Sequence, residues 1–147
     1  MKTPLQFMLT EFIFVYGTLR KTMATARREL LTKQGEYFSD GYLQGKLYDL
    51  GQYPGAIESA HSDERVYGEL YKITEDGSVL AQLDEYEECS DHFPEPHEHI
   101  RKQLPIQLAD GSTVNAWVYI YNRGVYGLKQ IKSGDYTAYI KTHHHRH

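Results

Sequence analysis

Hydrophobic residues along the chain recur mainly with the spacing of β-strands. Residues 12–16 form a continuous apolar run of β-branched and aromatic side chains that stops at Gly17. Such a run is typical of a central strand that is buried on both faces. Other segments alternate or are rich in strand-forming residues, and these are residues 37–48, 66–73, 101–108 and 114–121. Asp110-Gly111, between the last two segments, predicts a hairpin turn.

Two segments have helical spacing instead. Residues 22–31 carry apolar side chains near one face, which predicts a short helix. A second helix is predicted from a cap region at Thr74 through apolar residues at 79–83. Gly and Pro in residues 51–55 predict a turn or loop, and Pro and His in residues 92–99 predict an irregular segment. Several strands with a few short helices predict an α+β fold, with the strands in a mixed barrel.

The length of the chain predicts one domain. With 147 residues, the chain can bury a core without help from a disulfide or a metal. The predicted domain spans residues 12–140, after an N-terminal extension at 1–11 and before a His-rich tail at 141–147. The sequence does not fix the oligomeric state, and a monomer is the default expectation.

Charge and composition narrow the function classes. The formal net charge of −4 argues against a binder that holds nucleic acid mainly by electrostatics. No apolar run approaches the roughly 20 residues of a membrane span. Cys89 is the single cysteine, so an internal disulfide is excluded, which fits a reducing compartment. We therefore expect a cytoplasmic protein that binds neither nucleic acid nor membranes.

The turn after the apolar run is the first candidate for chemistry. A buried strand that ends in Tyr16-Gly17-Thr18-Leu19 can present backbone N–H groups to a carboxylate or an oxyanion. Gly17 permits close approach of a ligand. The same pattern is also typical of an ordinary turn. It matches neither a dinucleotide fingerprint nor a phosphate loop, because the further glycines and the Gly-Lys-Ser/Thr motif are absent.

A run of acidic residues at 84–88 is the second candidate. Glu87 follows Leu83 by four positions, which places both on the inward face of the predicted helix, whereas Glu85 and Glu88 are expected in solvent. A carboxyl group shielded from water takes up a proton more readily than a solvated one, which suits a general acid–base. The alternative is a charged helix end in contact with water.

Potential metal ligands gather after this run. Cys89, His92, His97 and His99 lie within eleven residues, but their spacing is not a usual zinc arrangement. A polar loop is the favoured interpretation, and no metal or cofactor is predicted. A metal-dependent hydrolase that uses these residues is a further alternative.

Six segments in order carry a family resemblance. They are VYGTL at 15–19, GQYPG at 51–55, VYGELY at 66–71, LDEYE at 83–87, AWVY at 116–119 and SGDY at 133–136. Together they resemble the γ-glutamylcyclotransferase-like family, which includes the AIG2-like and γ-glutamylamine cyclotransferase branches. The resemblance implies a small mixed β-barrel flanked by short helices. It also implies intramolecular cyclisation of a γ-glutamyl amine or γ-glutamyl amino acid to 5-oxoproline, with release of the amine.

The resemblance also implies residue roles. Glu87 aligns with the catalytic glutamate of the family. Tyr16, Gly17, Thr18 and Leu19 align with the loop whose backbone amides hold the substrate, and Tyr53, Pro54 and Gly55 align with a loop that borders the cavity. Two positions depart from the family pattern, since Glu88 replaces a usual glycine and His99 replaces a common tyrosine. Glu88 and the divergent loop at residues 89–98 favour an alternative function, a small-molecule binding or regulatory module without turnover.

Overall fold

The strand-like segments fold into a barrel with helices packed against it. A computed structural model describes residues 10–16, 29–51, 53–74, 78–87, 89–90 and 93–144. The elements, in chain order, are β1 (Thr10–Val15), β2 (Gly35–Asp49), β3 (Pro54–Glu58), β4 (Arg65–Thr74), α3 (Ser78–Tyr86), β5 (His99–Leu108), β6 (Thr113–Tyr121), β7 (Lys129–Gln130) and α4 (Tyr136–His144). Residues 29–34 are also helical.

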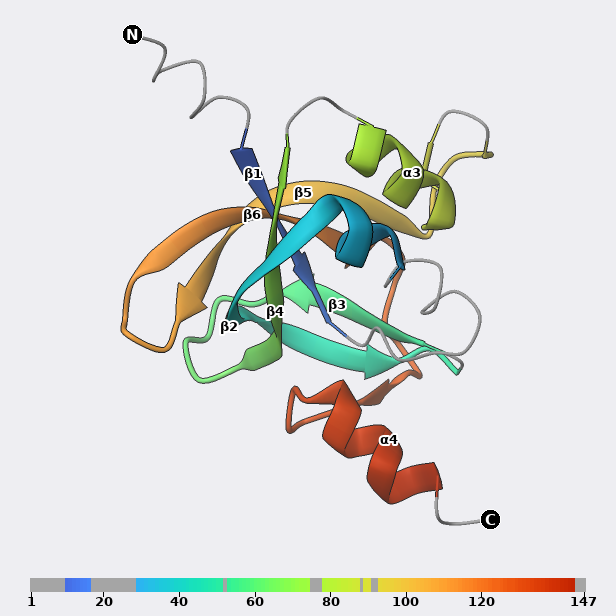
Figure 1. The fold of residues 1–147 in the computed structure, drawn as a ribbon. Helices are drawn as coiled ribbons and strands as arrows, with labels where there is room; N and C mark the ends of the chain where they lie inside the picture. Colours follow the sequence, from blue (N-terminus) through green and yellow to red (C-terminus); the bar gives the residue numbers. More distant parts are fainter. Residues whose placement is uncertain are drawn as a thin grey trace, which may run out of the picture.

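Five strands close into the barrel (Figure 1). β1 lies between β4, with which it is antiparallel, and β6, with which it is parallel. β5 pairs with both β6 and β2, and β2 pairs with β4, so the ring closes in the order β2-β4-β1-β6-β5. β3 and β7 pair with the second half of β2. This architecture confirms the predicted α+β fold, a small mixed β-barrel flanked by short helices.

β1 is buried on both faces, as its sequence predicts. Phe14 belongs to the core inside the barrel, whereas Ile13 and Val15 belong to a second core on the outside. All three side chains are buried. Because successive strand residues point to opposite faces, a strand that serves two cores must be apolar at every position.

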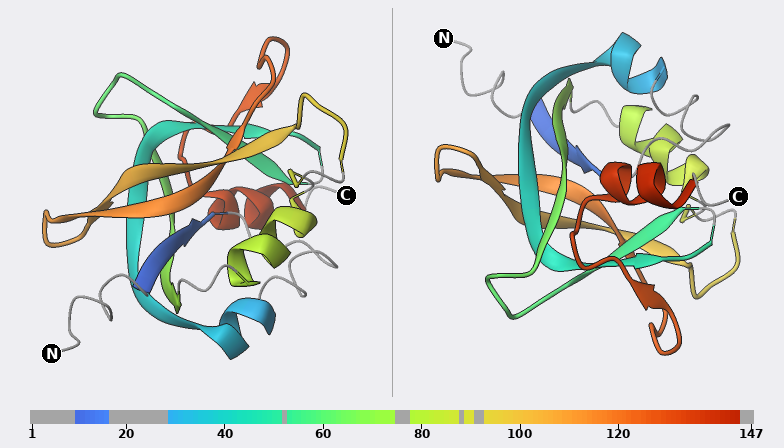
Figure 2. Two further views of the ribbon diagram at one scale, coloured as in Figure 1. Left: turned by 90° about the horizontal axis from the view of Figure 1, so that it is seen from above. Right: turned by 90° about the horizontal axis from the view of Figure 1, so that it is seen from below.

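The second core lies between the barrel and two helical segments. Val79, Leu80 and Leu83 of α3 pack there with Leu30 and Leu31 of the 29–34 segment. Figure 2 shows these two segments side by side along one flank of the barrel. The apolar face of α3 therefore sets its orientation, and the C-terminal end of α3 lies against the barrel.

A tight turn leads into α4, which packs on the barrel core. Gly134 has φ +71°, and a Cβ on it would lie 1.7 Å from the carbonyl oxygen of Arg65. Only glycine permits this approach without strain. Asp135 then caps α4, since its Oδ1 accepts the N–H of Ala138 at 3.1 Å. Tyr136, the first residue of α4, is buried in the barrel core.

The structure confirms the predicted hairpin. β5 and β6 are antiparallel neighbours in sequence, and the turn between them contains Gly111 at φ +90°. Asp110 stabilises the turn because its Oδ1 accepts the N–H of Ser112 at 2.9 Å. The predicted strands at 37–48, 66–73, 101–108 and 114–121 all lie within observed strands.

Other predicted boundaries differ from the observed ones. Pro54 and Gly55 begin β3, so residues 51–55 are only partly a loop, and the predicted helix cap at Thr74 is wrong because β4 continues through that residue. The predicted 22–31 helix is helical at 29–31 and continues to 34, while its residues 22–28 lie outside the described part. β1 begins at Thr10, two residues before the predicted domain boundary, and α4 extends into the His-rich tail.

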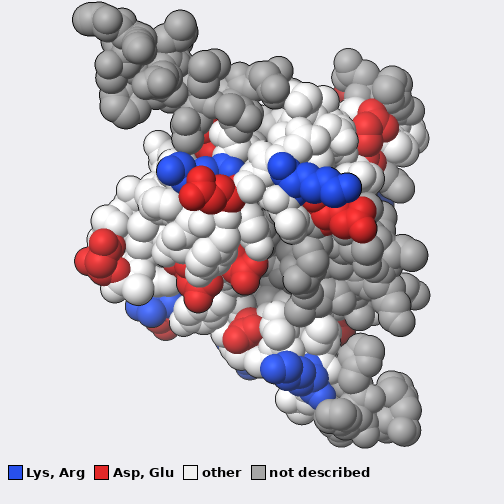
Figure 3. All heavy atoms as spheres, in the orientation of Figure 1, with Lys and Arg blue, Asp and Glu red and all other residues white. Residues whose placement is uncertain are grey.

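The described surface carries charges of both signs. On the face drawn in Figure 3, Lys and Arg side chains lie beside Asp and Glu side chains. Among the helices of the described residues, none combines the length and the hydrophobicity that crossing a membrane requires.

Candidate active site

Several strand ends and the end of α3 meet at one side of the barrel. Because β1 and β6 are parallel, their C-terminal ends lie together, and the antiparallel β5 begins beside them with His99 opposite Tyr121. The start of β3 also reaches this side, since the Ala56 N–H donates to the hydroxyl of Tyr16 at 3.1 Å. Tyr16 and the predicted loop at 53–55 therefore lie close together on this side of the barrel.

Tyr16 connects three of these strands. Its hydroxyl donates to the carbonyl oxygen of Tyr119 at 2.5 Å while it accepts the N–H of Ala56. The side chain is buried, with 9% of its surface exposed. The hydroxyl of Tyr16 thus binds the protein backbone, and any direct contact of this residue with substrate would come from its main chain. Gly17, Thr18 and Leu19 lie outside the described residues.

Tyr53 is the exposed member of the predicted loop at 53–55. Its hydroxyl donates to Oε1 of Glu98 at 2.7 Å, and its ring centroid lies 6.1 Å from that of His99. The buried His99 ring also lies 5.7 Å from the ring of Tyr121. Tyr53 therefore bridges the start of β3 and the start of β5, whereas the next two residues are buried in β3.

Glu87 lies directly after the last residue of α3. Its N–H donates to the carbonyl oxygen of Leu83 at 2.9 Å, so the helical hydrogen-bond pattern continues through this residue. Glu87 is half-buried and Glu85 is exposed, in line with the predicted inward and outward positions, while Glu88 lies outside the described residues. Glu87 is thus a partly buried residue at the end of a helix that packs on the barrel.

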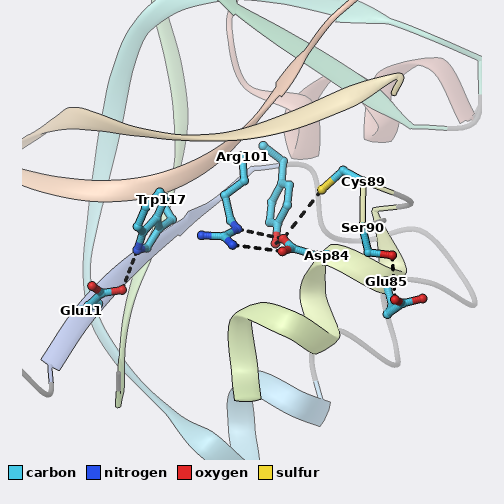
Figure 4. Close-up of polar contacts among 8 residues, drawn as sticks. Glu11, Asp84, Glu85, Cys89, Ser90, Arg101 and Trp117 are labelled. Carbon is cyan, nitrogen blue, oxygen red and sulfur yellow. Dashed lines mark hydrogen bonds and ion pairs between the residues drawn. The ribbon is translucent and has the colours of Figure 1, made fainter. Parts of the chain in front are cut away.

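Asp84, which the sequence reasoning did not select, is the centre of the polar contacts at this helix end (Figure 4). Arg101 donates to it from Nε at 2.8 Å and from Nη2 at 3.0 Å. The hydroxyl of Tyr119 donates to Oδ1 at 2.6 Å, and the thiol of Cys89 lies 3.7 Å from the same atom. Asp84 follows Leu80 by four positions, so the spacing that selected Glu87 from Leu83 would also have found Asp84 from Leu80.

The protonation of the groups around Asp84 follows from burial and charge. Burial opposes the charge of Arg101, but its hydrogen bonds and ion pair with Asp84 outweigh this and raise the pKa of Arg101. Burial and the hydrogen bond to Asp84 raise the pKa of Tyr119. Burial and the charge of Asp84, with a smaller contribution from Glu87, raise the pKa of Cys89 to about 12. The Tyr119 hydroxyl and the Cys89 thiol therefore act as protonated donors at neutral pH.

The contacts continue from Arg101 to β1. The guanidinium carbon of Arg101 lies 4.6 Å from the ring centroid of Trp117, a cation–π distance. The indole N–H of Trp117 donates to Oε1 of Glu11 at 2.6 Å. Figure 4 shows Glu11, Trp117, Arg101 and Asp84 in succession between β1 and the end of α3.

The potential metal ligands are dispersed. Cys89 contacts Asp84, His99 lies between the rings of Tyr53 and Tyr121, and His97 Nε2 lies 3.2 Å from the carbonyl oxygen of Phe93. Across the described ranges, no three His, Cys, Asp or Glu side chains are grouped so that they could hold a metal ion. His92 lies outside those ranges.

Comparisons with known proteins agree with the fold and the motifs. A family model described as gamma-glutamyl cyclotransferase, AIG2-like, matches residues 13–138. The gamma-glutamylcyclotransferase family protein YtfP of Escherichia coli K12 is 38% identical over 128 residues, which cover 84% of this chain and 94% of that protein. The gamma-glutamylaminecyclotransferase A of Danio rerio is 29% identical over 113 residues, which cover 73% of this chain and 66% of that protein.

A solved structure extends the likeness to three dimensions. The solution NMR structure of ytfP from Escherichia coli superposes with a TM-score of 0.57 at 34% identity, covering 85% of this chain and 95% of that one. The match of the family model spans most of the chain and includes β1 from residue 13, the other barrel strands, α3 and the first residues of α4. The chain therefore belongs to the gamma-glutamyl cyclotransferase, AIG2-like family.

Proposed function

We propose that this chain catalyses intramolecular cyclisation of a γ-glutamyl group to 5-oxoproline, with release of an amine or an amino acid. The observation that carries the proposal is the place of Tyr119. Its side-chain hydroxyl contacts Asp84 near the end of α3, and its carbonyl oxygen accepts the hydroxyl of Tyr16 at the end of β1. Asp84 and Tyr16 are thus both hydrogen-bonded to Tyr119. Glu87 comes three residues after Asp84, and the proposed substrate-binding turn begins at Tyr16, which supports one shared site.

The reaction suits a site of this kind. The α-amino nitrogen of the substrate attacks its own γ-carbonyl carbon, and a C–N bond forms that closes a five-membered ring. The bond between that carbon and the leaving nitrogen then breaks. Because the nucleophile belongs to the substrate, the protein needs to supply position, a proton carrier and stabilisation of the oxyanion. No atom changes its oxidation state, so the reaction requires no redox cofactor.

Glu87 is the proposed proton carrier. The attacking group is an ammonium at neutral pH and must lose a proton before it becomes a nucleophile. In the proposal the Glu87 carboxylate takes this proton and passes it to the leaving nitrogen. After attack the same carboxylate takes a second proton from the ring nitrogen, and this proton also passes to the released amine, which departs as an ammonium ion. General acid–base catalysis by a positioned group contributes about 10²–10⁴-fold to rate. The half-buried position of Glu87 at the end of α3 supports this role.

The substrate contacts in the proposal come from the two predicted loops. Backbone N–H groups of Gly17, Thr18 and Leu19 would hold the substrate and stabilise the oxyanion, and one good donor contributes about 3–4 kcal/mol. Tyr53, Pro54 and Gly55 would border the cavity. The exposed Tyr53, tied to Glu98 across the start of β5, supports a place at the rim.

The proposed substrate is a γ-glutamyl amine or a γ-glutamyl amino acid. The name of the Danio rerio relative favours the amines, whereas the family description names a gamma-glutamyl cyclotransferase without a leaving group. The proposal also keeps a monomer that acts in the cytoplasm without a metal or cofactor. Light scattering during size-exclusion chromatography tests the monomer, because the measured molar mass of a dimer would be twice the 17.1 kDa of one chain.

Detection of 5-oxoproline by mass spectrometry tests the activity. The purified chain is incubated with γ-glutamyl amines, γ-glutamyl amino acids and glutathione, in parallel with Glu87→Gln and Glu85→Gln. We expect product from the wild type and a loss of about two decades or more in Glu87→Gln, since the amide cannot accept the proton. Glu85→Gln removes the same charge from an exposed neighbour and should retain activity.

Each other result has a defined meaning. Retained activity in Glu87→Gln would exclude Glu87 as the proton carrier. No product from any compound, with melting shifts on addition of the same compounds, would favour the binding module over the enzyme. No product and no binding would reject both functions for these substrates.

A further inference from the structure

Asp84 contacts Cys89 across the short segment that contains Glu87. The carbonyl oxygen of Asp84 accepts the N–H of Cys89 at 2.9 Å, and its carboxylate accepts the thiol of the same residue at 3.7 Å. Within this segment, the N–H of Glu87 donates to Leu83. Asp84 thus contacts Cys89 through both its main chain and its side chain, while Leu83 holds the N–H of Glu87.

The Asp84 carboxylate also binds the barrel. Arg101 on β5 makes a bidentate contact with it, and Tyr119 on β6 adds a third hydrogen bond. The side chains of Asp84 and Arg101 are only 17% and 25% exposed. Hydrogen bonds between charged groups are stronger than neutral ones, and their strength rises where water is excluded. The end of α3 is thus held on two adjacent strands.

Arg101 is itself held in place by β1 and β6. Its guanidinium stacks on Trp117, whose indole N–H donates to Glu11. A partner that is already oriented loses little freedom when it binds Asp84, so the ion pair has a defined geometry. Figure 4 shows this line of contacts from β1 to the helix end.

The two carboxylates near the end of α3 therefore differ in their surroundings. The oxygens of Asp84 receive two guanidinium N–H groups, a phenol and a thiol, which leaves this residue a poor carrier for a substrate proton. We propose that Asp84 is the positioning residue for Glu87 and that, with Arg101 and Tyr119, it fixes where the proton carrier stands relative to the substrate. This inference rests on the proposed function.

Kinetics on paired variants test the inference. Asp84→Asn keeps the shape of the side chain but removes the charge that Arg101 binds. We expect kcat to fall by about 10- to 100-fold with KM changed less than about threefold. A displacement of a catalytic group by roughly 1 Å lowers the rate by up to about this factor. In the Glu87→Gln background the same substitution should change kcat by less than about threefold, since residues that act as one unit are not additive. Glu85→Gln, the adjacent exposed carboxylate, should leave kcat unchanged.

Two outcomes would overturn the inference. One is an unchanged kcat in Asp84→Asn. The other is that Asp84→Asn lowers kcat by the same factor in the Glu87→Gln background as in the wild type, which would mean that Asp84 acts independently of Glu87. If Asp84→Asn does not fold, Tyr119→Phe and Arg101→Lys each remove part of the contact. A loss of kcat of about three- to tenfold in both, with KM retained, supports the inference, and wild-type kcat in both overturns it.

A readout without turnover separates the inference from the proposed function. Hydrogen exchange at the amides of Glu87 and Cys89 should be at least about tenfold faster in Asp84→Asn than in the wild type, while exchange in β4 stays the same. If the wild type makes no 5-oxoproline, the proposed function fails, and unchanged exchange at these amides would then overturn the positioning role as well. Faster local exchange in an inactive protein would support Asp84 as the anchor of the segment and reject only the reaction.

Discussion

Replacing Tyr16 by phenylalanine removes one buried oxygen that joins three strands. The phenylalanine ring keeps the packing against Phe14, whose ring centroid lies 6.3 Å away. The hydrogen bond to the carbonyl oxygen of Tyr119 is lost, and the N–H of Ala56 loses its acceptor. Ala56 is fully buried, so water cannot replace that acceptor without a rearrangement.

The expected loss of stability follows from these two bonds. A net intramolecular hydrogen bond contributes about 1 kcal/mol, and a buried donor left without a partner costs about 1–3 kcal/mol. We therefore expect Tyr16→Phe to lower the free energy of unfolding by roughly 2–3 kcal/mol. For a chain of 147 residues the entropy of unfolding is about 0.3 kcal/mol/K, so Tm should fall by about 6–10 °C.

Urea unfolding followed by circular dichroism measures this loss, and calorimetry gives Tm. Tyr126→Phe is the matched control, because Tyr126 is fully exposed and its hydroxyl is in water. The control should change the free energy by no more than about 0.5 kcal/mol. A Tyr16→Phe variant that is equally stable would refute the assignment of this hydroxyl to the barrel frame.

Two further predictions concern a turn and a thiol. Gly134→Ala should lower the free energy of unfolding by more than about 3 kcal/mol, because its Cβ would collide with the Arg65 carbonyl. Gly111→Ala, at a similar φ with open space around it, should cost only about 1 kcal/mol, and equal losses in urea titrations would contradict this difference. With a pKa of about 12, Cys89 should react with iodoacetamide at pH 9 at least about tenfold more slowly in the folded chain than in urea. Since the thiol ionises more easily when unfolded, its contribution to stability is complete below about pH 8.5 and declines as the pH rises toward 12. Asp84→Asn should speed the alkylation, and an unchanged rate would contradict the assigned cause.

The strands with a clear buried face could be predicted from the sequence. The run at 12–16 has no polar position, which identifies a strand between two cores, and Asp110-Gly111 has the residue types that a tight hairpin requires. The boundaries agree to within a few residues. Each of these features depends on local residues, which is why the sequence alone was sufficient.

β3 and β7 were not predicted because their pairing is not local. β3 begins at Pro54-Gly55, residue types that favour turns, and β7 has only two residues. Both are strands because the second half of β2 offers them its edges. Periodicity shows which face of a strand is buried, but it does not show how far a strand extends or which partner it has.

Only the part of the candidate site that depends on local residues could be predicted from the sequence. Glu87 follows from helical spacing and from the family resemblance. Asp84 was missed because its partners, Arg101 and Tyr119, lie 17 and 35 residues further along the chain. Helical spacing from Leu80 separates Asp84 from Glu85. It does not show what Asp84 binds, because only the barrel brings β5 and β6 to that end of the helix.

The parallel pairing of β1 with β6 has a consequence for the synthesis of the chain. Ile13 lies opposite Trp117, roughly 100 residues later, and a ribosome adds about 5–20 residues per second. The N-terminal strand therefore emerges about 5–20 s before its second neighbour exists. During that interval an apolar segment without a charged residue between Phe12 and Tyr16 has at least one open edge, the type of strand that associates with other chains. We expect this short segment to be where a nascent chain most needs protection by a chaperone.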